Sequence, residues 1–221
     1  GRKVTVAANA PLASRVDVLV LTTGGHHLLD GVDLGPGAFE HVPTASPPML
    51  LGFACREALR DRIGGYDYYC YLEDDLIVRD PWLFAKLAWF NAQVGDERLL
   101  QPNRYEVAEK GIVRKVYVDG DLADRVIAQF DDVSSPPPVT GVYLGRPITF
   151  VRPKNPHSGC YILNARQMGT FAARADFLDR DCRFVGPLES AATLGVVRAF
   201  RIYKPAIENA AFLEIEHFGT G

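Results

Sequence analysis

The order of hydrophobic and polar positions predicts strands that alternate with helices. Residues 68–72 are apolar or aromatic at every position, which favours a strand covered on both faces, as in a parallel sheet. Residues 15–23 form an earlier apolar, β-branched run that ends at two glycines and predicts another strand. Between them, Ser46 precedes two prolines and apolar residues follow at helical spacing, so a helix is expected over 47–63. This order predicts a βαβ unit with a right-handed crossover.

The pattern continues through the rest of the chain. Asp80-Pro81 is expected to open a helix that ends at Gly95, Asn164 is expected to cap another, and Pro187 lies near the start of a third. Shorter apolar runs predict strands near 40–42, 111–118, 148–151, 160–163 and 200–203. Helices and strands therefore alternate, as they do in α/β proteins.

Length and composition favour one globular domain over residues 1–221. The chain has 221 residues, of which 48% are hydrophobic and 23% charged. Residues 119–146, where serines and prolines gather, predict a flexible loop region that is either a binding lid or a surface excursion. Only about a dozen residues precede Val16, so the opening strand and crossover helix of a nucleotide-binding half-sheet look abbreviated or missing.

The net charge and the placement of the cysteines indicate which classes of partner and which cellular compartment to expect. A net charge of −3 gives no basic field for nucleic acid or for an anionic membrane. No apolar run is long enough for a membrane span, and the N-terminus lacks the apolar stretch of a signal peptide. The four cysteines are far apart and form no CxxC pair, which favours buried thiols in a reducing cytosol. A cytoplasmic protein is therefore expected.

Three consecutive acids, Glu73, Asp74 and Asp75, follow the strand predicted at 68–72. In open α/β sheets, ligands bind outside the carboxyl ends of the strands. Carboxylates so close together repel one another, and a hard divalent cation with oxygen ligands offsets that repulsion while also holding a phosphate. The alternative is a solvated turn between a strand and a helix.

Glu73-Asp74-Asp75 resembles the acid-x-Asp (DXD) motif of GT-A-fold glycosyltransferases, and the resemblance covers roughly residues 16–221. It implies a GT-A-like, Rossmann-like three-layer sandwich around a mixed, mainly parallel sheet. It also implies that Asp75 binds Mn²⁺ or Mg²⁺, that Glu73 helps to hold the ribose or the metal shell, and that the cation grips the diphosphate of a nucleotide sugar. His217 is similar to the late histidine that completes the metal shell, although a packed core histidine is the alternative.

The resemblance assigns the other site residues as well. Glu189, in the first turn of a helix, resembles the general base of inverting enzymes, although the helix dipole alone favours an acid there. The usual two-acid signature is reduced to Leu188-Glu189-Ser190, which leaves the stereochemistry open. Arg104 is expected either to pair with Glu106 or to contact phosphate, and His157 either to contact the diphosphate or to fill a turn. The residues expected to bind the nucleotide sugar are Thr22, Thr23, Asp74, Asp75, His157, Ser158 and Gly159.

The expected function is therefore a metal-dependent glycosyltransferase that moves a sugar from a nucleoside-diphosphate sugar to an acceptor hydroxyl, with inversion. Its partners would be the donor and a carbohydrate or other hydroxyl acceptor. One alternative is a nucleotidyltransferase of related fold, but the loop after the first strand, residues 22–27, has glycines and no Lys or Arg for a triphosphate. The other alternative is a catalytically degenerate domain that binds a sugar or nucleotide.

Overall fold

The computed structural model describes residues 3–5, 15–108 and 115–219. The chain divides into two compact units, Gly1–Leu51 and Gly52–Gly221, where the sequence predicts a single domain. The two strands of the expected βαβ unit consequently belong to different units. Within the described residues, no helix is both long enough and apolar enough to cross a membrane.

The first unit contains a small parallel sheet of β1 (Leu19–Thr23) and β2 (Glu40–Thr44), in which Leu21 lies opposite Val42. The apolar run that predicts a strand over 15–23 thus becomes a strand only in its second half. Two short 3₁₀ helices, η2 (Leu29–Gly31) and η3 (Pro48–Leu50), follow β1 and β2 in turn. A proline does occupy the first position of η3, but the N-cap residue is Pro47 and not Ser46, and no side chain caps this helix.

The helices of the second unit are α1 (Leu51–Arg60), α2 (Leu83–Val94), α3 (Asp124–Ile127), α4 (Ala165–Ala172), α5 (Pro187–Ala199) and the 3₁₀ helix η4 (Ile207–Phe212). The sequence predicts four of them, α1, α2, α4 and α5, although α1 is shorter than the expected 47–63, and it does not predict α3 or η4. Asn164 and Gln167 form a capping box at the start of α4, because each side chain bonds to the backbone N–H of the other. Gly95 ends α2 with φ 83°, a conformation that glycine adopts without strain.

The strands of the second unit form three small sheets. β3 (Tyr68–Leu72) pairs with β10 (Cys160–Asn164). A four-stranded sheet has the order β5 (Arg98–Leu100), β11 (Arg201–Pro205), β9 (Arg146–Val151) and β8 (Val139–Tyr143). Another has the order β4 (Leu76–Ile77), β12 (Glu214–His217), β6 (Asn103–Val107) and β7 (Lys115–Tyr117). The fold is therefore a mixed α/β arrangement.

The expectation of mainly parallel strands is wrong for the described ladders. In the second unit only β5 with β11 and β6 with β12 run parallel, whereas β3 and β10, among others, are antiparallel. The strand predicted at 111–118 is described only from residue 115, as β7, and the rest of it lies outside the described residues. An all-apolar strand indicates cover on both faces, but it does not indicate the direction of its neighbours.

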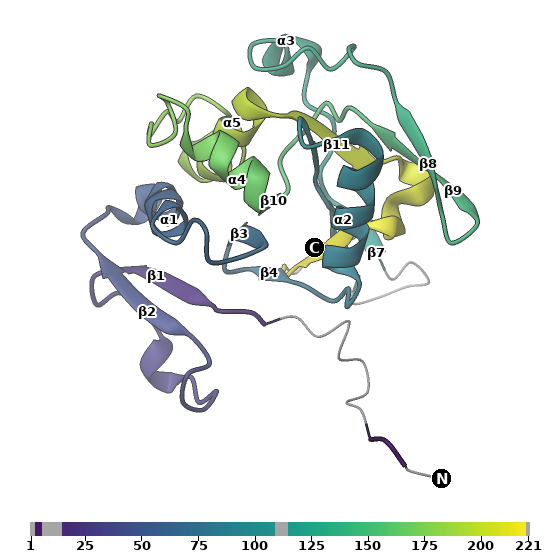
Figure 1. The fold of residues 1–221 in the computed structure, drawn as a ribbon. Coiled ribbons are helices and arrows are strands. Elements are labelled where there is room, and N and C mark those ends of the chain that lie inside the picture. Colours follow the sequence, from purple (N-terminus) through teal and green to yellow (C-terminus); the bar gives the residue numbers. More distant parts are fainter. Residues whose placement is uncertain (1–2, 6–14, 109–114, 220–221) are drawn as a thin grey trace. The chain divides into compact units, whose positions relative to one another are not determined.

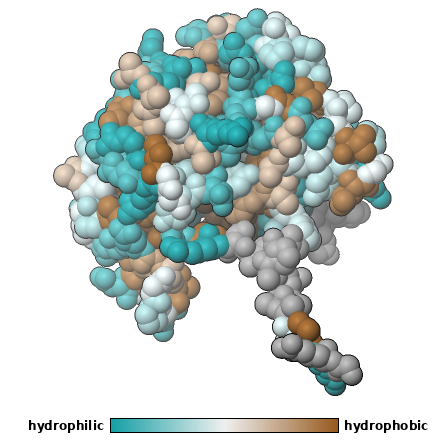
Figure 2. All heavy atoms as spheres, viewed as in Figure 1, coloured by the Kyte–Doolittle hydropathy of each residue, from teal (hydrophilic) through white to brown (hydrophobic). Residues whose placement is uncertain are grey.

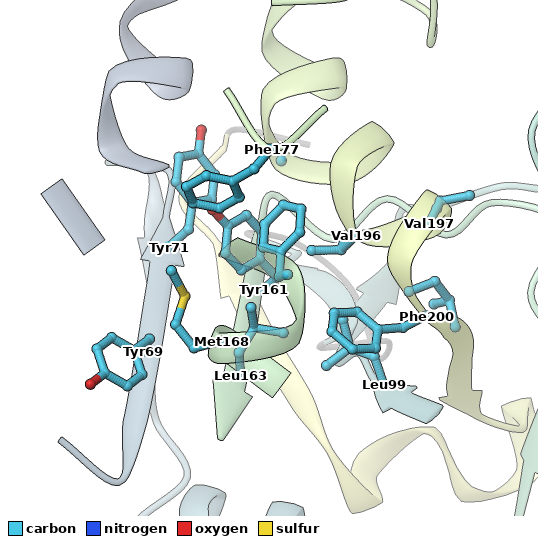
Figure 3. Close-up of a cluster of buried hydrophobic side chains, with 13 residues drawn as sticks. Tyr69, Tyr71, Leu99, Tyr161, Leu163, Met168, Phe177, Val196, Val197 and Phe200 are labelled. Atoms are coloured by element: carbon cyan, nitrogen blue, oxygen red, sulfur yellow. The ribbon is translucent and has the colours of Figure 1, made fainter. Parts of the chain in front are cut away.

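Side chains of β3 and β10 alternate between two hydrophobic cores, so both faces of this pair are covered. Tyr69 and Tyr71 point into a core that α4 and α5 close (Figure 3), and within it the ring of Tyr71 stacks on that of Tyr161 at 5.1 Å. Tyr68 and Cys70 pack instead against a second core, to which α2 contributes Leu83, Leu87 and Phe90. Figure 1 shows α4 and α5 together near β10, with α2 apart from them. The cover predicted for 68–72 is confirmed.

Residues 119–146 contain regular structure where the sequence predicts a flexible loop region. α3 lies within this stretch, and β8 forms a hairpin with β9 in which Gly141 lies opposite Ile148. The two turn residues, Leu144 and Gly145, both have positive φ (49° and 76°), as a tight two-residue hairpin turn requires.

On the face drawn in Figure 2, hydrophobic residues lie in several separate groups among polar ones.

Candidate functional site

The three acids lie in the turn that connects β3 to β4, at the carboxyl end of β3. Glu73 N donates to Gly159 O at 3.0 Å, which continues the pairing of β3 with β10 beyond its last residue. Leu76 N donates to Glu73 O and closes the turn, and Phe218 N donates to Asp75 O at 2.7 Å. The turn is thus fixed on one side by the loop before β10 and on the other by the end of β12.

The structure brings Asp75 and His217 into direct contact. His217 lies opposite Leu76 in the antiparallel pairing of β12 with β4, so its ring reaches the preceding residue. Its Nε2 lies 3.1 Å from Asp75 Oδ2, and its Nδ1 lies 2.7 Å from Glu106 Oε1. His217 is therefore held between two carboxylates and is not merely a packed core residue.

The pKa of Glu73 is raised well above its ordinary value. Burial, and next the charge of Asp75, raise its pKa to about 7; the charge of Glu189 adds to the rise, whereas Arg104 and His217 oppose it. The charges of Asp75, Glu189 and His217 thus all act on Glu73. Among these four predicted residues, only Asp75 and His217 are in hydrogen-bond contact in the described structure.

Gly159 provides the space that Glu73 occupies. A Cβ at this position would lie 2.7 Å from Glu73 Oε2, and the backbone has φ 63°, which disfavours any residue with a side chain. Gly159 is itself buried. Gly159, which is expected to bind the nucleotide sugar, therefore leaves room for the carboxylate of Glu73 in this structure.

Glu189 lies in the first turn of α5, as predicted. Its Oε2 would be 2.8 Å from a Cβ on Gly186, so the carboxylate folds back over the residue that precedes the helix. The start of α5 is fixed by Ser190, whose Oγ accepts from Phe184 N at 3.0 Å and donates to Phe184 O at 2.9 Å. Val185, with φ 60°, adopts a conformation that is strained for a β-branched residue.

A buried ionic network lies beside these acids. Asp119 accepts from Arg104 Nη2 at 2.9 Å and from Lys204 Nζ at 3.0 Å, and Lys204 also donates to the carbonyl of His157. Lys204 is 4% exposed and Asp119 has an 8% exposed side chain. Arg104 thus pairs with Asp119, not with Glu106 as one reading of the sequence expects.

The side chains of His157 and Ser158 both make hydrogen-bond contacts with other groups of the protein. His157 Nδ1 lies 3.0 Å from Thr193 Oγ1, and Ser158 Oγ donates to Pro102 O at 2.8 Å. Burial, followed by the charge of Arg104, lowers the pKa of His157 to about 4. A neutral, buried imidazole gives no positive charge to a diphosphate, so these two side chains act in holding the loop before β10.

His157 should make folding stability depend on pH. Because its folded-state pKa lies below the ordinary 6.5, its contribution is complete above pH 6.5 and is lost as the pH falls toward 4. We expect the change from pH 7 to pH 5 to cost wild type about 2 kcal/mol more than it costs His157→Gln. Urea unfolding of both proteins at both pH values measures this difference. Equal losses would contradict the assignment, and the raised pKa of Glu73, which acts in the opposite direction, cancels in the comparison.

Three predicted residues remain: Asp74, Thr22 and Thr23. Asp74 is exposed. Thr22 and Thr23 belong to the first unit, where Thr22 Oγ1 donates to Gly24 O at 3.0 Å and Thr23 Oγ1 donates to Ser46 O at 3.0 Å. Their assignment to the donor remains a prediction.

The side chains of Glu73, Asp75 and His217 have the donor chemistry of a divalent-cation site. Glu73 Oε1 and Asp75 Oδ1 are buried and have no hydrogen-bond partner among the described residues, which is costly for a carboxylate. A hard cation could satisfy such oxygens, and the Nε2 of His217 lies 3.1 Å from the other oxygen of Asp75. In the part of the chain that is described, no three His, Cys, Asp or Glu side chains already converge as a ligand set. Asp75 and His217 would have to give up their mutual contact to take a cation.

Comparisons with protein-family models, with curated proteins and with solved structures give no match to this chain. Two features of the site escape sequence reasoning. The first is the contact of Glu106 with His217, and the second is the network around Asp119. Each joins residues that are far apart in the sequence, and the neighbouring residues give no signal of it.

Proposed function

We propose that the chain is a metal-dependent glycosyltransferase that uses a nucleoside-diphosphate sugar. The supporting observation is that Asp75 and His217 are in contact at the carboxyl end of β3, where Glu73 Oε1 and Asp75 Oδ1 are buried without partners among the described residues. The charge of Glu189 acts on Glu73 as well. Helices on both faces of the β3–β10 pair agree with a GT-A-like three-layer arrangement for this unit. The finer fold and the activity are both part of the proposal.

The carboxylates and the imidazole would hold Mn²⁺ or Mg²⁺. Asp75 and His217 are the proposed ligands, and Glu73 would supply an oxygen to the same shell or to the ribose. When bound, such a cation offsets the negative charge that develops on a departing nucleoside diphosphate. The antiparallel pairing of β12 with β4 keeps His217 beside Asp75 before any ligand arrives. Pre-organisation of this kind lowers the entropic cost of binding.

Glu189 is the proposed base. As the bond from the anomeric carbon to the diphosphate oxygen breaks, its electron pair leaves with the diphosphate, and the acceptor oxygen forms the new glycosidic bond. The acceptor hydroxyl loses its proton to a Glu189 carboxylate oxygen, which must lie within hydrogen-bond reach of it. Two features hold Glu189 in the first turn of α5. One is the pair of hydrogen bonds between Ser190 and Phe184, and the other is the close approach of the Glu189 carboxylate to Gly186.

Metal-dependent nucleotide binding tests the proposal. Thermal unfolding should be measured with Mn²⁺ and, in turn, uridine, guanosine and thymidine diphosphates. One nucleotide is expected to stabilise the protein by about 2.7 kcal/mol at 100-fold over its Kd, and only when Mn²⁺ is present. Asp75→Asn is expected to abolish this response, because it removes a proposed ligand.

A matched control for Asp75→Asn is Asp61→Asn, which removes an exposed acid of the same unit and should leave the response unchanged. Absence of any Mn²⁺-dependent shift with all three nucleotides would refute the proposal. A full response in Asp75→Asn would instead refute the assignment of the ligand.

A further inference from the structure

Glu106 and His217 lie side by side on neighbouring strands. β6 and β12 are parallel, with Glu216 opposite Tyr105, so the residue after each of these lies at the same end of the pair. Glu106 Oε1 contacts His217 Nδ1 at 2.7 Å, the shorter of the two contacts that the ring makes. The Glu106 side chain is 15% exposed, which limits the competition of water for this hydrogen bond.

The backbone after β12 closes over this pair. A Cβ on Gly219 would lie 2.8 Å from Glu106 Oε1 and 3.1 Å from His217 Nδ1, so only glycine leaves the contact undisturbed. Phe218 N donates to Asp75 O on the other side of His217. The position of the imidazole is thus set by the pairing of β12, by the contact with Glu106 and by the backbone at Gly219.

A neutral imidazole has one N–H and one lone pair, and its hydrogen-bond partners decide which nitrogen carries the proton. Glu106 and Asp75 are both carboxylates that can only accept, but Glu106 lies closer to the ring, at 2.7 Å against 3.1 Å, which favours the N–H on Nδ1 when the ring carries one proton. The lone pair of neutral His217 then lies on Nε2, which faces Asp75 Oδ2 at 3.1 Å. Two acceptors cannot remain at that distance without a proton or a cation between them.

We propose that Glu106 is a positioning residue, which keeps the proton of His217 on Nδ1 and so presents Nε2, together with Asp75, to a divalent cation. This inference rests on the proposed function, since it concerns the same cation. A carboxylate that orients a ligating histidine in this way also raises the basicity of the ligand. Glu106 itself does not touch the cation or the substrate.

Two measurements test the proposal. Mn²⁺ affinity is measured by titration calorimetry for wild type, Glu106→Gln and the control Glu214→Gln. Glu214 is a carboxylate of the same sheet that bonds to Lys115 and Tyr117, not to His217. We expect Glu106→Gln to weaken Mn²⁺ binding 10–100-fold and Glu214→Gln to leave it within about twofold. The glutamine amide can donate to Nδ1, which moves the proton to Nε2, where it blocks the lone pair.

Imidazole ¹⁵N NMR supplies the readout that a purely structural role would not move. In Mg²⁺-loaded wild type, His217 should carry its proton on Nδ1, and Glu106→Gln should shift the population toward a proton on Nε2. A proton on Nε2 in loaded wild type would overturn the proposal without the use of any variant. Unchanged affinity in Glu106→Gln would overturn it too, whereas a wild type that binds no Mn²⁺ would remove the proposed function as well.

Discussion

Replacing Glu189 with glutamine should lower kcat for the proposed sugar transfer by about 10²–10⁴-fold and leave the affinity for the proposed nucleotide-sugar donor nearly unchanged. The range is the usual contribution of a positioned general base. Glutamine keeps the size of the side chain and its place over Gly186, but it cannot accept the proton of the acceptor hydroxyl. Donor binding should persist, because the proposed cation ligands are Asp75, His217 and Glu73.

The measurement is release of nucleoside diphosphate with Mn²⁺ and an acceptor panel, alongside donor binding by calorimetry. Glu57→Gln, which removes an exposed acid from α1, is the matched control and should retain full activity. If Glu189→Gln transfers sugar at the wild-type rate, the base is another group. If it loses donor binding instead, Glu189 belongs to the donor site.

Asp119→Asn should destabilise the protein by about 3–5 kcal/mol, because it leaves Lys204 buried without a charged partner. Burial lowers the pKa of Lys204, and Asp119 is the charge that opposes this shift most. The variant also removes the partner of Arg104, whose guanidinium makes two contacts with Asp119 Oδ1. The carbonyl of His157 remains for Lys204, so the ammonium keeps one hydrogen bond.

Urea unfolding at pH 7 measures this loss. The control is Asp121→Asn, two residues away and exposed, for which a change within about 0.5 kcal/mol is expected. A loss below about 1 kcal/mol for Asp119→Asn would show that water or a side-chain movement solvates Lys204.

Local signals account for the parts of the fold that the sequence predicts well. Asn164 and Gln167 form their capping box from residues three positions apart, and Gly95 ends α2 through its own φ. These features need no distant partner, so the residues alone carry the information. The buried strand at 68–72 is also predicted, because an apolar run records the cover on both of its faces.

Strand direction, α3 and the β8–β9 hairpin are among the parts that the sequence does not predict. The hairpin turn is Leu144-Gly145, and only the glycine matches the usual Asn-Gly or Asp-Gly signal. The prolines that precede β8 favour a loop, although pairing with β9 makes the following residues a strand. Direction depends on which strands become neighbours, which is a tertiary property.

Some residues of the candidate site are predicted from the sequence, and others are not. Glu73 and Asp75 are predicted from a short run at a strand end, and Glu189 from its place in a helix. Glu106 is not predicted, because its role depends on the parallel pairing of β6 with β12. Nothing in the residues around Glu106 indicates that pairing.

His217 and Asp75 are 142 positions apart, although they touch. Closing so long a segment costs chain entropy, and the pairing of β4, β12 and β6 helps to offset it. Contacts of this range form late and slow the folding of a domain, whereas α2 and α4 can form early from neighbouring residues. Refolding followed by Mn²⁺ binding should therefore lag behind refolding followed by helical circular dichroism.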